Sequence, residues 1–131
     1  MTDPVREFIR AFNERDLDAF VAVLDPEVEL HSGRGLRKGR EAARIWATRK
    51  PGGVQQTIEL EELYEEGLES GGGRAVALVR RRWRWEEDRS EAGTEEMAWA
   101  FELRDHKISS WRPYDDREEA LRVTNFAPPL G

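Results

Sequence analysis

The chain has 131 residues, of which 38% are hydrophobic and 37% charged, and its net charge is −6. This length predicts one domain with a buried core, and the negative charge disfavours a general phosphate-binding surface, so we expect no nucleic acid partner. The chain has no cysteine and two histidines, which excludes disulfides and thiol nucleophiles and argues against a structural zinc site.

We expect a single domain over residues 1–131, with residues 124–131 as a carboxyl-terminal tail. No apolar run approaches the roughly 20 residues that a membrane span needs. The first residues lack a basic segment followed by an apolar one, which is the pattern of a secretory signal. These features predict a cytoplasmic protein with no membrane partner, and nothing in the sequence calls for a metal or a cofactor.

Two segments with helical apolar spacing open the chain. Asp3 and Pro4 suit the cap and the first position of a helix over residues 4–14. Asp16 suits the cap of a second helix, which Pro26 ends near residue 24. In each segment apolar side chains recur at i, i+3, i+4 and i+7: Val5, Phe8, Ile9 and Phe12, then Leu17, Phe20, Val21 and Leu24.

A strand and a third helix follow. Residues 28–32 alternate apolar with polar side chains and predict a strand, and residues 32–35 predict a loop. Gly39 precedes a helical pattern that reaches about residue 49. We expect this helix to bury Ala42, Ile45 and Trp46.

The rest of the chain predicts a meander of strands. Leu63 breaks the alternation of the first strand, which indicates a β-bulge near Glu61 and Glu62. The predicted elements are strands over 57–66, 74–87, 95–104 and 107–114, a hairpin turn at 70–73, a loop at 88–94, a tight turn at 105–106 and a helix over 116–123. Segregated helices and antiparallel strands predict the α+β class.

Six segments between residues 5 and 121 carry a family resemblance: VREFIRAFN (5–13), DLDAF (16–20), DPEVEL (25–30), KGREA (38–42), FELRD (101–105) and YDDREEAL (114–121). In these segments the chain resembles the SnoaL-like branch of the nuclear-transport-factor-2-like superfamily. The resemblance implies N-terminal helices packed in a strongly curved, mostly antiparallel sheet that forms a cone, with a pocket between them. It also implies a homodimer through the outer face of the sheet. It does not imply one reaction, because this fold hosts several.

The catalytic residues of the ketosteroid isomerases do not carry over. By resemblance, their helix-one tyrosine falls on Phe8, which has no hydroxyl group. Their general-base aspartate falls near Ser32, and their protonated aspartate falls near Trp99. All three roles are therefore vacant in this chain.

Two other catalytic sets of the fold are also incomplete. The epoxide hydrolases use an Asp-Arg-Asp set, for which Arg81 is available and Asp115 is the single candidate aspartate. The cyclases use a histidine and an aspartate, and strand parity points His31 outward. The candidate catalytic residues are thus Asp115, as a base if it is buried beside Trp111, and Ser32, as a hydrogen-bonding group.

Arg81 lies on the strand with the most unusual composition, in which arginines and tryptophans alternate. By resemblance, we place its side chain toward the pocket, where a guanidinium group can anchor a carboxylate or another anion. The alternative is an ion pair with a neighbouring strand. The carboxylates available for that ion pair are Glu59, Glu61 and Glu102, and the arginines expected on the opposite face are Arg80, Arg82 and Arg84.

Aromatic side chains dominate the elements that border the cone. A pocket lined by indole rings favours a flat, apolar ligand with few polar groups. The alternative is that the rings fill the cone and leave no cavity. The predicted ligand-binding residues are Phe12, Leu30, Ser32, Trp46, Arg81, Trp83, Trp99, Phe101 and Trp111.

Three functions follow from this sequence. The first is a protein that binds a small hydrophobic molecule in an aromatic-lined pocket. The second is an isomerase, epoxide hydrolase or cyclase that acts on a hydrophobic metabolite. The third is a dimeric scaffold with a filled core. A second inward carboxylate or histidine near Arg81 would favour the enzyme, and the sequence pattern does not identify one.

Overall fold

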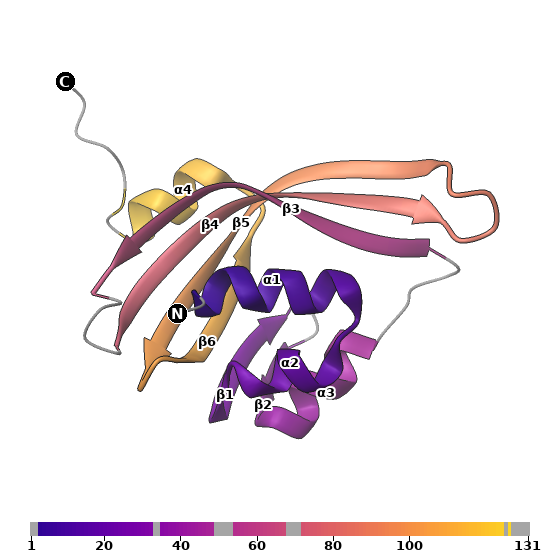
Figure 1. The fold of residues 1–131 in the computed structure, drawn as a ribbon. Coiled ribbons are helices and arrows are strands. Elements are labelled where there is room, and N and C mark those ends of the chain that lie inside the picture. Colours follow the sequence, from indigo (N-terminus) through magenta and orange to yellow (C-terminus); the bar gives the residue numbers. More distant parts are fainter. Residues whose placement is uncertain (1–2, 33–34, 49–53, 68–71, 125, 127–131) are drawn as a thin grey trace.

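The computed structural model describes the chain except for residues 1–2, 33–34, 49–53, 68–71, 125 and 127–131 (Figure 1). The described part contains these helices and strands in chain order: α1 (Pro4–Glu14), α2 (Leu17–Ala22), β1 (Leu24–Ser32), β2 (Gly35–Lys38), α3 (Arg40–Thr48), β3 (Val54–Glu66), β4 (Gly73–Trp85), β5 (Glu91–Arg104), β6 (Lys107–Tyr114) and α4 (Arg117–Val123). Within the described residues, no helix combines the length and the apolar character that a membrane crossing requires.

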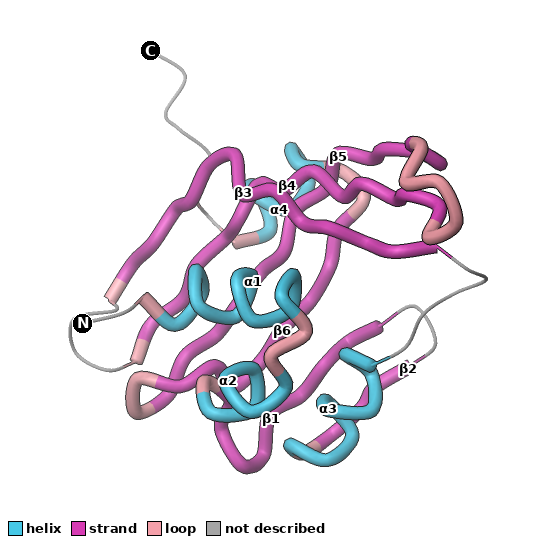
Figure 2. Tube along the Cα trace, turned by 45° about the vertical axis from the view of Figure 1, so that its right-hand side comes forward, coloured by secondary structure: helices cyan, strands magenta, loops and turns pink. Residues whose placement is uncertain are grey.

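The strands form one curved, unclosed sheet in the order β2-β1-β6-β5-β4-β3. All neighbouring strands are antiparallel except β1 and β6, which run parallel. Helices α1, α2 and α3 lie on one side of the sheet and α4 lies on the other (Figures 1 and 2). This arrangement confirms the predicted α+β class and the predicted curved sheet around the N-terminal helices.

Local capping explains the bounds of α1, which match the prediction. The Asp3 side chain accepts a hydrogen bond from the Val5 N–H at 2.9 Å, and Pro4 occupies the first helical position. The helix ends because Arg15 adopts a left-handed conformation with φ of 57°. Asp16 then caps α2 by accepting a hydrogen bond from the Ala19 N–H.

The β-bulge predicted in β3 is present. The register of β3 against β4 shifts between Leu60 and Glu62. The extra residue returns Leu63 to the same side of the sheet as Leu60, so both pack on the helix-covered core.

The two faces of the sheet differ in what covers them. We call the side packed against α1, α2 and α3 the inner face, and the side that carries α4 the outer face. The inner face buries Ala75, Ala77, Val79, Met97, Trp99, Phe101 and Trp111 with the helices, and the outer face buries Val76, Leu78 and Ala98 with Ala120 of α4. Successive side chains along each strand point to alternate faces of the sheet, as strand geometry requires.

The structure corrects several predicted boundaries. Strand β2 was not predicted, because its four residues lie where a loop was expected to end. Strand β1 begins at Leu24 rather than at residue 28, and β5 begins at Glu91 within the predicted loop. The predicted turn at 70–73 lies partly outside the described residues. The tight turn at 105–106 is confirmed by positive φ angles of 52° and 63°.

The predicted buried face of α3 is wrong for Ile45 and is confirmed in part for Trp46. Ile45 is 54% exposed, whereas Ala43 and Ala47 are buried. Trp46 is half-buried and packs against the core. The sequence pattern favoured Ile45 because bulky apolar residues are expected inside, whereas the helix buries the small side chains of Ala43 and Ala47.

Candidate functional site

An aromatic cluster lies between the helices and the inner face of the sheet. Its rings come from three helices and two strands: Phe8, Phe12, Phe20, Trp46, Trp99, Phe101 and Trp111. The ring centroids of Trp46 and Trp111 are 4.8 Å apart, and those of Trp99 and Trp111 are 5.3 Å apart. Five of the predicted ligand-binding residues are thus in one cluster: Phe12, Trp46, Trp99, Phe101 and Trp111.

Two indole N–H groups in this cluster have no hydrogen-bond acceptor in the described part of the chain. Trp99 is 2% exposed and Trp111 is 3% exposed. Within the described residues, neither Nε1 atom has a partner. A buried donor without an acceptor costs about 1–3 kcal/mol, so each of these groups is a point where an acceptor from outside the chain would stabilise the protein.

Leu30 and Ser32 lie on β1. Leu30 is fully buried, and its Cα lies opposite that of Trp111 in the parallel β1–β6 pair. Ser32 is the last residue of β1, two residues further along the strand. The pairing of β1 with β6 therefore brings this part of the first strand beside the aromatic cluster, although the two segments are about 80 residues apart in the sequence.

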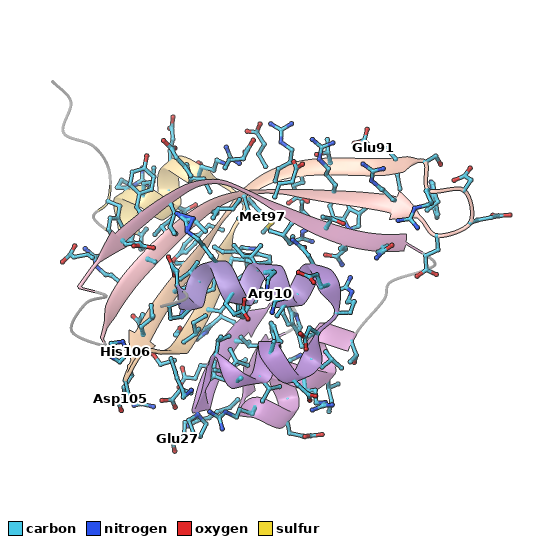
Figure 3. All side chains as sticks on the ribbon, in the orientation of Figure 1. Arg10, Glu27, Glu91, Met97, Asp105 and His106 are labelled. Carbon is cyan, nitrogen blue, oxygen red and sulfur yellow. The ribbon has the colours of Figure 1, made fainter. Side chains whose placement is uncertain are left out.

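Arg81 lies on the inner face of β4 at the border of the cluster. Its guanidinium carbon is 5.2 Å from the centre of the Trp83 ring, and Nη2 is 3.1 Å from the sulfur of Met97. Figure 3 shows Met97 between the sheet and α1. The Arg81 Nε atom is buried without a partner, and no carboxylate among the described residues forms an ion pair with Arg81.

Sequence reasoning missed a carboxylate that lies across from Arg81. Glu95 of β5 is directly opposite Arg81 in the β4–β5 pair, so both side chains are on the inner face. Glu95 is half-buried, and among the described residues it has no ion-pair partner. Strand alternation could have revealed Glu95, because it is two residues from Met97 and four from Trp99 on the same strand, and side chains an even number of residues apart share a face.

Arg15 provides a second inner cation. Its guanidinium carbon is 4.7 Å from the centre of the Phe12 ring. Its Nη1 and Nη2 atoms donate to the carbonyl oxygens of Phe12 and Gln56, at 3.1 and 3.3 Å. The Nε atom is buried without a partner in the described chain, and burial lowers the pKa of the Arg15 guanidinium.

The other candidates lie outside the cluster. Asp115 is exposed, so the burial beside Trp111 that a basic role would need is not seen. Asp116 caps α4 by accepting hydrogen bonds from the Glu118 and Glu119 N–H groups. His31 is on the outer face, as strand parity predicted, with Nε2 3.5 Å from Glu29 and Nδ1 3.4 Å from Arg112.

The outer face near α4 carries a groove of about 430 Å³. His31, Arg112 and Tyr114 contribute to its walls, together with Val123 and Phe126. Across the described residues, no group of three or more histidine, aspartate or glutamate side chains is placed to hold a metal ion.

Comparison with known proteins supports the fold. The sequence matches the SnoaL-like domain over residues 5–111. A comparison with curated protein sequences finds no match. Solved structures similar to this chain share its fold at low sequence identity, and three of them follow.

A protein from Catenulispora acidiphila with a ketosteroid isomerase-like fold, in complex with trimethylamine, has a TM-score of 0.71 at 14% identity over 97% of this chain and 95% of its own. An LEH-like epoxide hydrolase from M. tuberculosis has a TM-score of 0.69 at 18% identity over 93% of this chain and 86% of its own. An NTF2-like protein of unknown function from Burkholderia pseudomallei has a TM-score of 0.68 at 22% identity over 95% of this chain and 98% of its own.

These structures show a common architecture rather than a common reaction. The match to the domain family covers most of the chain, and the curved sheet around three helices agrees with it. The chain therefore belongs to the SnoaL-like family and has the NTF2-like fold.

Proposed function

We propose that the protein binds a small, flat, mostly apolar molecule against the aromatic cluster. In this proposal, oxygen atoms of the bound molecule accept hydrogen bonds from the indole N–H groups of Trp99 and Trp111. The observation that supports it is the burial of both donors without an acceptor in the described chain. Buried hydrogen-bond donors nearly always have an acceptor. Two donors without one in the same cluster therefore favour an acceptor supplied by a bound molecule.

The chemistry of the surrounding side chains favours the same class of ligand. Indole and phenyl faces attract flat apolar groups, and their edges offer few other polar contacts. Trp46 of α3 is half-buried, so the cluster is partly accessible to solvent at this residue. A ligand that carries one or two carbonyl or ether oxygens would use both the faces and the two N–H groups.

The test is nuclear magnetic resonance of the five indole N–H groups, assigned with single Trp→Phe variants. The ligand series pairs flat ketones, such as anthrone, with hydrocarbons of the same shape, such as anthracene. We expect the ketones to shift the Trp99 and Trp111 signals and to bind about tenfold more tightly than the hydrocarbons. Trp85 is 47% exposed and is the internal control. A series in which no compound moves either signal would contradict the proposal.

A second candidate is an enzyme of the isomerase, epoxide hydrolase or cyclase type. Glu95, half-buried and opposite Arg81, supplies the inward carboxylate that such a reaction needs as a base. Purified protein would be assayed on panels of epoxides and enones. We expect Glu95→Gln to abolish any turnover found, and Glu96→Gln, which changes the neighbouring side chain on the outer face, to leave it unchanged.

The third candidate, a dimeric scaffold with a filled core, is favoured by the close ring contacts in the cluster. Dimerisation itself is compatible with all three candidates. We propose that it uses the outer face, where Val123 is 59% exposed beside the 430 Å³ groove. Light scattering after size exclusion would give the molar mass, and Val123→Asp is expected to convert a dimer to monomer. A dimer whose indole signals respond to no ligand would support the scaffold.

A further inference from the structure

The arginines of this sheet fall into two groups. On the outer face, Arg80 lies 2.9 Å from Glu96, and Arg82 lies 2.9 Å from Glu59. On the helix side, Arg15 and Arg81 have no carboxylate partner among the described residues. Each has a buried Nε atom without a partner in the described chain; Arg80 has one as well, but its Nη2 atom is ion-paired. All four arginines are half-buried. Arg15 and Arg81 therefore depart from the usual preference, because buried charges are normally paired and these two lack a carboxylate partner among the described residues.

The two unpaired arginines approach the same stretch of β3. Arg15 reaches the carbonyl oxygen of Gln56 at 3.3 Å, and Gln56 lies opposite Trp83 in the β3–β4 pair. The guanidinium group of Arg81 lies 5.2 Å from the Trp83 ring. The connection between helix and strand is fixed by Asn13, whose side chain bonds to both the N–H and the carbonyl oxygen of Ile58 at 2.8 Å.

Both arginines also border the aromatic cluster. Arg15 lies over the Phe12 ring, and Phe12 contacts Trp46 and Trp99 at centroid distances of 5.5 and 6.1 Å. Arg81 contacts Met97, which follows Glu95 by two residues on the inner face and precedes Trp99 by two. A ligand on the aromatic cluster would therefore have cations at one edge, contributed by the C-cap residue of α1 and by β4.

We propose that the molecule bound by the aromatic cluster is a carboxylic acid, and that Arg15 and Arg81 hold its carboxylate at the edge of the cluster. This inference rests on the proposed function, since it names the polar end of the same ligand. Guanidinium groups bind carboxylates through parallel N–H donors, and such charge-assisted bonds are about twice as strong as neutral ones. The unpaired Nε atoms are donors of this kind.

The balance of charge limits the ligand further. Arg15 and Arg81 contribute two positive charges and Glu95 contributes one negative charge, which leaves a net charge of +1 on this part of the inner face. This charge matches a monoanion and disfavours a dianion such as a phosphate monoester. In this proposal, Glu95, which lies opposite Arg81, accepts a hydrogen bond from a hydroxyl group beside the ligand carboxylate. The structure therefore favours flat aromatic monocarboxylic acids over phosphates and dicarboxylic acids.

The experiment compares 2-naphthoic acid with its primary amide, 2-naphthamide, by calorimetry at pH 7. The two probes have the same shape and differ in charge. We expect the acid to bind about tenfold or more tightly than the amide, which corresponds to one additional charge-assisted pair. Arg81→Leu and Arg15→Leu should each reduce this preference, and Arg81→Lys, which keeps the charge and loses the planar fork, should retain part of it.

Arg84→Leu is the matched control, because Arg84 is exposed and lies on the outer face beside Arg82. We expect it to leave the preference unchanged. Circular dichroism and the spread of the indole signals check that each variant is folded, and Arg81→Lys serves where Arg81→Leu does not fold.

Equal binding of the acid and the amide, with the indole signals still responding, would overturn this inference and leave the proposed function standing. A preference for the acid that survives in both Arg→Leu variants would also overturn it. Binding of neither probe, with no indole response to the ketone series, would contradict the proposed function itself.

Discussion

Arginine side chains have different surroundings on the inner and outer faces of strand β4. On the outer face, Arg80 and Arg82 pair with glutamates of the neighbouring strands. On the inner face, Arg81 contacts a tryptophan ring and a methionine sulfur, and the glutamate opposite it does not form an ion pair with it. Ion pairs that are partly in water contribute little to stability, in either direction. A half-buried cation without a partner lowers stability unless a ligand supplies the opposite charge.

Two glutamates of β3 repeat this contrast. Glu61 is on the outer face, where a hydrogen bond from Arg117 lowers its pKa. Glu65 is opposite Ala75 on the inner face, where its pKa is raised to about 7, first by a hydrogen bond shared with the Asp3 carboxyl group and then by partial burial. The outer face thus stabilises the charged form of Glu61 through a partner, whereas the surroundings of Glu65 on the inner face favour its neutral form.

The largest expected effect comes from removing a ring of the inner cluster. Phe8 is fully buried and contacts the rings of Phe20, Trp99 and Phe101. Phe8→Ala should lower the free energy of unfolding by about 3–5 kcal/mol, because it leaves a cavity that the neighbouring rings cannot fill. Urea unfolding measures this loss. Ile45→Ala, which changes an exposed side chain of α3, should alter stability by less than about 0.5 kcal/mol. A loss there as large as that of Phe8→Ala would contradict the link between burial in the cluster and stability.

The next effect concerns the one buried carboxylate among the described residues, Asp25. A hydrogen bond from Arg104 lowers its pKa, and the Glu27 N–H adds to this. Because the folded-state pKa lies below the unfolded value, the stabilisation is present above the ordinary carboxyl pKa and is lost as the pH falls through the folded value.

Asp25→Asn should therefore lower the urea midpoint at pH 7 by less than Phe8→Ala does, and should weaken the dependence of the midpoint on pH between 5 and 2. A variant with the same acid dependence as the original protein would show that Asp25 is not the group responsible.

Glu65 should give the opposite dependence on pH. Its folded-state pKa, about 7, lies above the ordinary value, so its contribution to stability is complete at low pH and is lost as the pH rises through 7. Glu65→Gln should raise the urea midpoint at pH 8 and have little effect at pH 4. Glu66→Gln on the same strand controls for the loss of one negative charge. An equal gain from both variants at pH 8 would point to net charge rather than to the pair with Asp3.

The smallest effect is expected on the outer face. Arg82 pairs with Glu59, and both side chains are partly in water. Arg82→Ala should cost only about 0.2–1 kcal/mol and should lose most of that cost in high salt. Arg81→Leu is the comparison on the inner face, where removal of an unpaired cation is expected to leave stability unchanged or to raise it. A larger loss from Arg81→Leu than from Arg82→Ala would indicate a structural role for Arg81.

Much of the fold was predictable because its signals are local. The cap formed by Asp3 and the spacing of apolar residues gave the bounds of α1, and Leu63 revealed the bulge in β3. The alternation along β4 put Arg81 on the same face as Val79 and Trp83, and the family resemblance assigned that face to the pocket side. The burial of α3 was not predictable, because the distance between packed helices decides whether a bulky residue such as Ile45 fits inside.

The candidate site was predictable in part. The aromatic residues were identified, since each lies on an element that its own pattern assigns to the core. Glu95 was missed, although strand parity would have placed it on the inner face with Met97 and Trp99. Arg15 was not considered, because its position depends on how α1 ends and on the strand that happens to lie beside it.

The sequence by itself determined the order of helices and strands, the two faces of each strand and the aromatic character of the core, because periodicity and capping act over a few residues. Tertiary structure decided which polar groups are left without partners. The parallel pairing of β1 with β6 places Leu30 beside Trp111, and the packing of α1 on β3 brings Arg15 to the same edge as Arg81. Hydrogen bonds and ion pairs depend on distances of a few ångströms between segments far apart in the chain, and only the folded arrangement sets those distances.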